Sequence, residues 1–193
     1  MGRVISDMSM SLDGFIVGSE EDRLHDWVFK GPVEVTIAGI TFHMASEASA
    51  EILKTLIQNA GSVIVGKQGF KSVNETAIFQ LPTFVLAHDA QTSITGEGAT
   101  ITFVTDGIHS ALAQAQAAAG DKDVYIFGGA NTIQQYLIAG LIDEIRVDLV
   151  PILMGHGIRL FDHLANTTIT LEIADVIPSQ GVTHLKYRIV KSH

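Results

Sequence analysis

Short apolar runs alternate with helical patterns through the middle of the chain. The runs are almost wholly apolar, which is typical of strands that are buried on both faces of a sheet. They lie at 62–65, 83–87, 100–104 and 123–127. Helices are expected from Ser46, as N-cap, to Gly61, as C-terminal glycine, and at 108–119 and 132–139. This alternation predicts a mostly parallel sheet with helices on both faces.

The two ends of the chain follow other patterns. Residues 3–10 are expected to form a strand that leads into a turn, followed by a short extended piece at 15–17. Residues 18–45 have no clear period, so we expect a long loop with short helical pieces. In the last third, strand-like runs without a strong helix between them predict antiparallel strands at 145–152, 168–176 and 184–190. No linker or repeat interrupts the chain, which predicts one domain over 1–193.

Composition and charge exclude several classes of function. Twelve basic and 21 acidic residues give a net charge of −9, which disfavours binding to nucleic acid. The absence of cysteine excludes disulfides, thiolate metal sites and cysteine nucleophiles, and the histidines show no metal-binding spacing. No apolar run approaches the roughly 18 residues of a membrane span, and the start of the chain lacks a signal-peptide pattern. We therefore expect a cytoplasmic protein with no membrane partner and no metal.

Glycines follow two of the predicted buried strands. Gly128 and Gly129 come directly after 123–127 and precede a helix, and Gly66-Lys67-Gln68-Gly69 follows 62–65. Glycine lets a ligand approach the backbone closely, and a helix N-terminus attracts phosphate. Both segments can also be read as simple tight turns, with Lys67 in solvent. Neither matches GxGxxG or GxxxxGK[ST], but ligands of parallel sheets bind at the carboxyl ends of strands, where both glycine pairs lie.

Several segments, in this order and spacing, resemble the reductase domain of the bifunctional riboflavin-biosynthesis deaminase–reductase and its stand-alone dihydrofolate-reductase-like relatives. They are Ser11-Leu12-Asp13-Gly14-Phe15-Ile16, Val65-Gly66-Lys67, Ile126-Phe127-Gly128-Gly129-Ala130 and 151–161. The resemblance covers essentially the whole chain. It implies a dihydrofolate-reductase-like α/β three-layer sandwich, NADPH as hydride donor, and a homodimer. The implied substrate is a small molecule, either a polar heterocycle like a pterin or an aminopyrimidine, or a carbonyl.

The resemblance also implies the positions of the cofactor and substrate. The adenosine 2′-phosphate and pyrophosphate would lie near Gly66, Lys67, Gln68 and Gly69, with His88 near the adenosine end. The other phosphate contacts would come from Phe127, Gly128, Gly129, Ala130 and Thr132. Ser11, Leu12, Asp13, Gly14, Phe15 and Ile16 would border the nicotinamide and substrate, and Gly155, His156 and Gly157 would close the far side of that pocket.

The chain departs from the family pattern at informative positions. Lys67 and Gly69 stand where the family often has Arg and Thr, which removes one hydroxyl contact to phosphate. Phe15 replaces a basic residue that is usual in riboflavin-pathway reductases, which argues against a ribose-phosphate substrate. The deaminase half is absent, because its zinc site requires cysteine. Asp26, beside Trp27, is a candidate for the acidic residue of folate reductases.

Two questions stay open at the level of the sequence. Asp13 could orient the substrate or relay a proton, or it could be a turn residue that binds local N–H groups. Ser11 has no GxSxG context, so a serine hydrolase is not indicated. The whole chain could be an NADPH-dependent reductase, or a nucleotide-binding or sensory module of the same fold without turnover.

Overall fold

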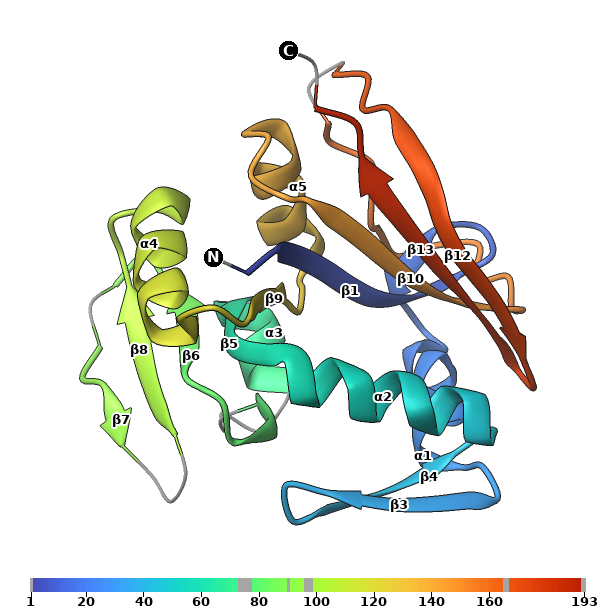
Figure 1. Ribbon diagram of the computed structural model, residues 1–193. Coiled ribbons are helices and arrows are strands. Elements are labelled where there is room, and N and C mark those ends of the chain that lie inside the picture. The colour runs from blue at the N-terminus through green and yellow to red at the C-terminus, as the bar shows by residue number, and fades with distance from the viewer. Residues whose placement is uncertain (1, 73–77, 90, 96–98, 165–166, 192–193) are drawn as a thin grey trace.

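The computed structural model describes residues 2–72, 78–89, 91–95, 99–164 and 167–191, and its centre is a sheet (Figure 1). Among these residues the sheet has nine strands in the order β12-β13-β10-β1-β9-β5-β6-β8-β7. The parallel strands are β1 (Val4–Ser11), β5 (Ala60–Gly66), β6 (Thr83–Leu86), β8 (Thr100–Val104), β9 (Asp123–Ile126) and β10 (Glu144–Val150). The antiparallel strands lie at the two edges and are β7 (Ile94–Thr95), β12 (Leu171–Ser179) and β13 (Val182–Ile189). This arrangement confirms the predicted fold class.

Helices cover both faces of the sheet, with α2 and α5 on opposite sides of β1 and β9 (Figure 1). On one face, α2 (Glu47–Asn59) packs Leu56 against Ile5 and Tyr125. The short α3 (Lys67–Ser72) lies on the same face, where its Phe70 packs with Val65. On the other face, α4 (Ile108–Ala119) and α5 (Ala130–Ile138) bury their apolar sides on the largest cluster of the core.

The start of α2 is as predicted, but its end is not. Ser46 is the N-cap, and its hydroxyl accepts the N–H of Ser49 at 3.1 Å. Gly61 does not close the helix, because α2 ends at Asn59 and Gly61 already lies inside β5. A Cβ at Gly61 would lie 2.7 Å from Ala119 at the end of α4. Gly61 therefore serves close packing between β5 and α4.

The segment 18–45 contains more structure than its pattern predicts. The expected short helices are η1 (Glu21–His25) and α1 (Asp26–Phe29). The expectation of a loop elsewhere is wrong, because β3 (Val33–Ile37) and β4 (Ile40–Met44) form a separate antiparallel hairpin below α2 (Figure 1). Val35 and Phe42 of the hairpin are buried in a cluster with Trp27. The hairpin thus covers the outer side of α2 with a second small core.

The last third of the chain forms one side of the sheet. β10 lies between β1 and β13, so it is an interior strand and its edges are paired. After Val150 the chain leaves the sheet and returns as β11 (Ile158–Arg159), which pairs with β2 (Phe15–Val17). In the middle of the chain, the short helix η2 (Ile78–Gln80) comes just before β6, which begins at Thr83.

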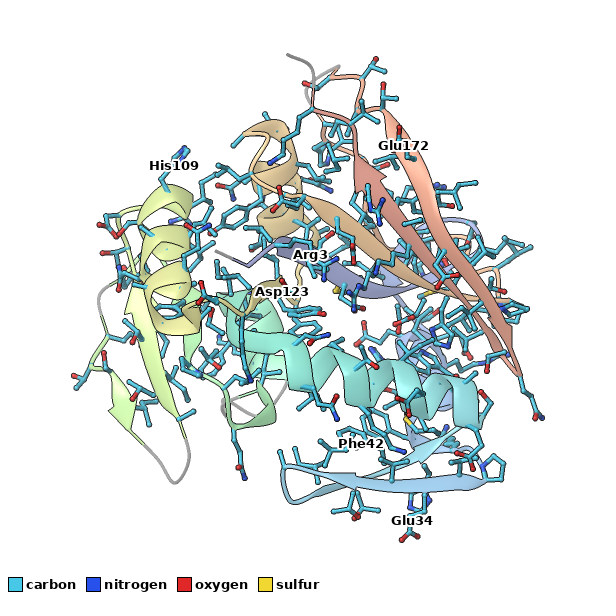
Figure 2. The ribbon with its side chains drawn as sticks, in the orientation of Figure 1. Arg3, Glu34, Phe42, His109, Asp123 and Glu172 are labelled. Atoms are coloured by element: carbon cyan, nitrogen blue, oxygen red, sulfur yellow. The ribbon has the colours of Figure 1, made fainter. Side chains whose placement is uncertain are left out.

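Arg3 ties the start of β1 to both of its neighbours. Its guanidinium contacts Asp123 of β9 and Glu144 of β10, each at 2.9 Å. Figure 2 shows Arg3 and Asp123 close together above α2. Because Glu144 is almost completely buried, its charge needs such a partner, and Arg146 supplies a second one at 2.7 Å. These ion pairs fix the order of β9, β1 and β10.

Candidate functional site

The two glycine turns that the sequence singles out lie side by side. β5 and β9 are parallel neighbours, so both end at the same edge of the sheet. The N–H of Gly66 donates to the carbonyl of Gly128 at 3.0 Å. A Cβ at Gly66 would lie 2.5 Å from Oγ1 of Thr132, and one at Gly69 would lie 3.4 Å from the N atom of Gly129. Side chains at these positions would push the two turns apart.

The N-terminus of α5 opens into space between these turns. Gly129 is its N-cap, and no side chain accepts the free N–H groups of the first turn. Gly128 has a φ of +67°, which favours glycine, and the Gly128–Gly129 peptide is cis. A Cβ at Gly129 would meet no described atom within 4 Å. Free N–H groups, a helix dipole and open space fit the binding of a phosphate group.

The predicted adenosine end is built around Lys67. Lys67 is the first residue of α3, and its Nζ lies 3.7 Å from a carboxylate oxygen of Asp89. Asp89 follows β6 and has 83% of its side chain exposed, and the neighbouring His88 is also exposed. Gln68 is exposed in the same turn of α3. No pattern in the sequence singles out Asp89, because its contact joins the start of α3 to the loop after β6.

The predicted substrate side also comes together, through the carboxylate of Asp13. It accepts the hydroxyl of Ser11 at 2.7 Å and the N–H groups of Met154 and Gly155 at 3.1 and 2.8 Å. The hydrogen bond from Ser11 and those from the two backbone N–H groups lower the pKa of Asp13 to about 2. Asp13 therefore joins the turn after β1 to the segment after β10, as a turn residue does.

A basic side chain lies beside this turn, although the turn itself contains no basic residue. Phe15 and Ile16 are buried, whereas Leu12 is exposed. The guanidinium of Arg159 lies 4.3 Å from the ring centre of Phe15 and donates to the backbone carbonyl of Asp13 at 2.8 Å. Gly14 has a φ of +91° in the turn that carries Asp13. A basic group thus stands beside Phe15 although it comes from β11, so sequence order alone could not reveal it.

The segment 155–157 closes this turn from the outside. A Cβ at Gly157 would collide with the carbonyl oxygen of Val17, so β2 and this segment can pair only with glycine there. His156 is exposed to solvent. Asp13, Arg159 and the pairing of β2 with β11 therefore hold the turn after β1 against the segment 154–159, while Ser11, Phe15 and Ile16 are buried.

A buried polar group on the α2 face of the sheet was missed by sequence reasoning. Nδ1 of His184 lies 2.6 Å from Asp148, and its Nε2 lies 2.9 Å from the hydroxyl of Ser49. The indole N–H of Trp27 donates to Ser9 at 3.1 Å. Asp7 also belongs to this group, since it lies on the same face of β1 as Ser9. The only signal in the sequence was an acidic residue in the middle of a strand that otherwise looked apolar.

Asp148, His184 and Ser49 have the connectivity of a serine-hydrolase triad. Ser49, however, has no exposed surface, and its hydroxyl also contacts Ser179 at 2.9 Å. A nucleophile must reach its substrate, so this chain of hydrogen bonds is structural. It ties α2 to β10, β12 and β13.

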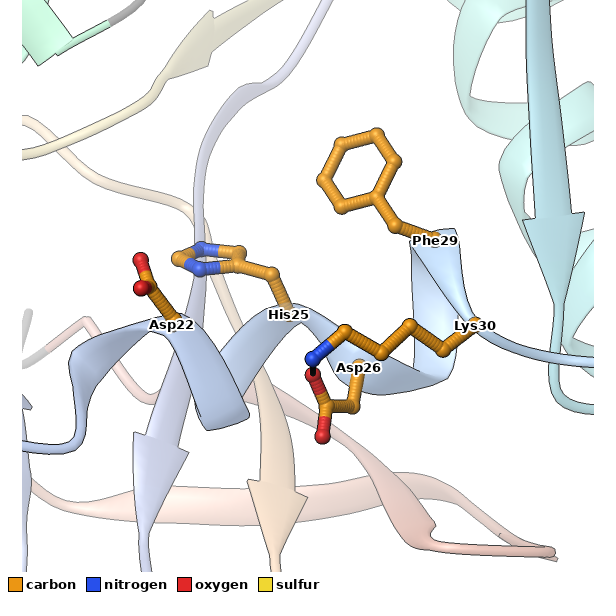
Figure 3. Close-up of a pocket in the computed structure, with 5 residues that line it drawn as sticks. All are labelled: Asp22, His25, Asp26, Phe29 and Lys30. Carbon is orange, nitrogen blue, oxygen red and sulfur yellow. Dashed lines mark ion pairs between the residues drawn. The ribbon is translucent and has the colours of Figure 1, made fainter.

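A shallow hollow of about 300 Å³ lies on a different part of the surface (Figure 3). Its lining comes from one short segment and consists of Asp22, His25, Asp26, Phe29 and Lys30. Asp26, the sequence candidate for an acidic residue, pairs there with Lys30 at 2.8 Å. The hollow shares no residue with the glycine turns.

Among residues 2–72, 78–89, 91–95, 99–164 and 167–191, no cluster of three or more His, Asp or Glu side chains could hold a metal ion. Nor is any helix in the described part of the chain long and apolar enough to cross a membrane.

The chain is similar in sequence to one protein family and in fold to several solved structures, among them a dihydrofolate reductase. The chain matches the family of the RibD C-terminal domain over residues 3–185. The uncharacterised protein YwjB of Bacillus subtilis (strain 168) is 26% identical over 164 residues, 83% of each chain. A candidate riboflavin biosynthesis protein of Shewanella sp. PV-4 has a TM-score of 0.75 at 23% identity, covering 98% of this chain and 99% of that one. Dihydrofolate reductase of Enterococcus faecalis, complexed with NADP(H), has a TM-score of 0.62 at 13% identity and covers 98% of both.

The sheet order, the antiparallel C-terminal strands and the paired glycine turns define a reductase-like fold of the dihydrofolate reductase type. Within that class, the chain belongs to the family of the RibD C-terminal domain.

Proposed function

We propose that the protein is an NADPH-dependent reductase that transfers a hydride to a small polar heterocycle, similar to a pterin or an aminopyrimidine, or to a carbonyl. The observation that carries this proposal is the meeting of two glycine turns beside the open N-terminus of α5. The family and the NADP(H) complex of a structural neighbour support it.

Each part of the site would have a separate task. The backbone of Gly66–Gly69 and of Phe127–Ala130, with Thr132, would hold the pyrophosphate, and Lys67 and His88 would meet the adenosine end. The surface from Ser11 to Ile16, with Gly155 and Gly157, would border the nicotinamide and the acceptor. When bound, NADPH supplies the hydride. The chain's own residues orient the acceptor and exclude water from it.

One observation favours a second candidate, a nucleotide-binding module without turnover. Asp13 accepts hydrogen bonds from Ser11, Met154 and Gly155, and its pKa is lowered to about 2. It is therefore ionised at neutral pH and has no proton to give to an acceptor. If no other acid serves the site, binding without reduction follows.

Cofactor titration followed by a turnover assay separates the two candidates. NADPH fluorescence is titrated against the protein, and loss of absorbance at the nicotinamide band is then followed with dihydrofolate, with aminopyrimidines and with simple carbonyl compounds. Binding together with oxidation of NADPH by at least one acceptor supports the reductase. Binding without oxidation by any of them supports the module, and no binding contradicts both.

A further inference from the structure

We propose that Asp7 is the acid that delivers a proton to the acceptor during reduction, an inference that rests on the reductase function proposed above. Asp7 lies neither in the conspicuous Asp-Gly turn nor in a glycine segment. It lies inside β1, on the α2 face of the sheet. Its position, its missing hydrogen bonds and its neighbours each support this role.

The register of the sheet brings Asp7 to the edge of the candidate cofactor site. β1 pairs with β9 only as far as Ser6, which lies opposite Ile126, the last residue of β9. Asp7 is the next residue of β1, at the level where β9 turns into the glycine segment. On the opposite face of β1, the sulfur of Met8 lies 3.1 Å from where a Cβ of Gly128 would be. Asp7 and Met8 thus flank the start of the glycine turn.

Asp7 is enclosed but has no fixed partner for its carboxyl group. Only 8% of its surface is exposed. Within the described ranges, no group donates a hydrogen bond to its carboxyl group, whereas Asp148 contacts His184 at 2.6 Å. An enclosed carboxyl without a donor is more stable in its protonated form than as a carboxylate. Asp7 can therefore hold a proton until an acceptor takes it.

The charged groups around Asp7 shift its pKa in opposite directions. β10 carries Arg146 directly opposite Asp7, with Glu144 and Asp148 one step to either side on the same face. Burial, the negative charge of Asp148 and that of Glu144 raise the pKa of Asp7 well above its usual value, although Arg146 lowers it. The α2 residues on this face are Ser49, Leu53 and Leu56, and none of them titrates. This face also carries Arg3, which precedes β1, Asp123 and Tyr125 of β9, and His184, Lys186 and Arg188 of β13.

Reduction of a C=N or C=O bond requires both a hydride and a proton. The hydride adds to carbon, and the electron pair of the double bond moves to nitrogen or oxygen. That atom takes the proton of the Asp7 carboxyl, so an O–H bond of Asp7 breaks and an N–H or O–H bond of the product forms. Asp7 is left as a carboxylate and regains a proton from water. The acceptor thus gains one hydride, which carries two electrons, and one proton, and the cofactor is oxidised.

The test compares the unmutated protein with Asp7→Asn, which keeps the shape of the side chain but has no acidic proton. Carboxyl ¹³C NMR over a pH series gives the titration of Asp7, identified by the signal that Asp7→Asn lacks. NADPH binding is measured by fluorescence, and the hydride-transfer step by stopped flow with whichever acceptor the unmutated protein reduces. Asp175→Asn, which changes an exposed carboxyl of β12, is the matched control.

We expect Asp7 to titrate above the ordinary aspartate range. We also expect Asp7→Asn to bind NADPH with an unchanged Kd but to lose about 100-fold or more of the hydride-transfer rate, as for other general acids. Asp175→Asn should match the unmutated protein in both respects. The fold of each variant is checked by its thermal unfolding.

The outcomes separate this inference from the proposed function. If Asp7 titrates near its ordinary pKa, or if Asp7→Asn reduces the acceptor at the unmutated rate, the assignment of Asp7 is wrong while the reductase stands. If the unmutated protein binds NADPH but reduces no acceptor, the reductase proposal fails and the role of Asp7 fails with it.

Discussion

Lys67 is the one basic side chain that the sequence assigns to the cofactor, and the structure gives it an acidic neighbour. Its Nζ lies 3.7 Å from Asp89, whose side chain is largely exposed. A lysine in this place attracts the 2′-phosphate of NADPH, whereas an aspartate repels it and can bind the free 2′-hydroxyl of NADH. Cofactor preference at this site is therefore set by two opposing charges.

Removing each charge is expected to shift cofactor preference in opposite directions. Lys67→Ala should reduce the preference for NADPH over NADH by about 1–2 kcal/mol, the size of a charge-assisted contact. Asp89→Asn should increase that preference, because the repulsion of the 2′-phosphate is lost. Fluorescence titration of both cofactors at fixed ionic strength measures both effects.

Exposed charges are screened by salt, which provides an internal control. The differences between the variants should shrink when the titration is repeated at high salt. Equal affinity of the unmutated protein for NADPH and NADH would contradict the role of Lys67.

Asp7 and Asp13 are expected to affect stability with opposite dependence on pH. The folded-state pKa of Asp13 is about 2, below the usual 3.8, so its contribution is full above pH 3.8 and is lost as pH falls toward 2. The pKa of Asp7 is raised well above 3.8, so the unfolded chain loses this proton first and stability falls as pH rises above 3.8.

Thermal unfolding of the two asparagine variants over a pH series tests both signs. Asp13→Asn should unfold at a lower temperature than the unmutated protein near neutral pH, and the gap should close as pH falls toward 2. Asp7→Asn should gain stability relative to the unmutated protein as pH rises above 3.8. A gap that is independent of pH in either variant would contradict the corresponding pKa shift.

At the scale of elements, the sequence predicted best where one pattern decides the structure. The helix at Ile108–Ala119 and the strand at Thr100–Val104 have the expected bounds, because the helix has one buried apolar face and the strand is a short run rich in β-branched residues. The hairpin of β3 and β4 could not be predicted in this way. Its strands bury few residues, and its turn uses Ala38 and Gly39 with φ values of 51° and 76°. Alanine rarely adopts a positive φ, so no turn signal was present.

The residues of the candidate site also divide into those that a local sequence pattern reveals and those that it does not. The glycine turns and the Asp13 turn were found because glycine and Asp-Gly are local signals that do not depend on distant partners. Asp89, Arg159 and Asp148 were not found, because each matters through a contact with a residue in another part of the chain. Asp7 was hidden by its neighbours, since an isolated acid in an apolar strand has no period or motif of its own.

The N-terminus of α5 gives a direct test of the cofactor site. Gly129 has an extended backbone, and a Cβ there would meet no described atom within 4 Å, so Gly129→Val should leave the fold intact. The new side chain would occupy the space in front of the free N–H groups and should abolish NADPH binding. Gly129→Ala, with a smaller side chain, should have an intermediate affinity. Fluorescence titration and thermal unfolding are measured on the same samples, and normal binding by Gly129→Val would mean that the segment is only a turn.

At the scale of the whole molecule, sheet order explains why these residues meet. α2 follows β1 on one face, and α5 follows β9 on the other, so the connections leave in opposite directions at these neighbouring strands (Figure 1). Ligands of parallel sheets bind at such a switch point. Both glycine turns and the Asp13 turn lie at the carboxyl ends of β5, β9 and β1, and Asp7 lies inside β1 at the level where β9 ends.

The same sheet order changes where a dimer surface is expected, from the segment 145–160 to β12. The apolar, strand-rich pattern of 145–160 predicts a homodimer formed through an open sheet edge there, but β10 is paired on both sides, and the edge on this side of the sheet is β12. Figure 2 shows Glu172 of β12 on this outer side of the molecule. Leu171, Ile173 and Val176 of β12 are exposed, and their cross-strand partners on β13 belong to the core on the α5 face. A register shift between Ile173 and Asp175 keeps these apolar residues on one face.

We predict that two copies of the chain pair through this apolar strip of β12, formed by Leu171, Ile173 and Val176. Ile173 has 71% of its surface exposed, and an apolar strip at an open sheet edge is unfavourable in water unless it is covered. Light scattering at micromolar concentration should give about twice the 20.7 kDa mass of one chain. Ile173→Lys should lower the mass to that of one chain without loss of fold, because a charge would be buried at the contact. Glu172→Gln, on the other face of the same strand, should leave the dimer intact, and a one-chain mass for the unmutated protein would refute the pairing.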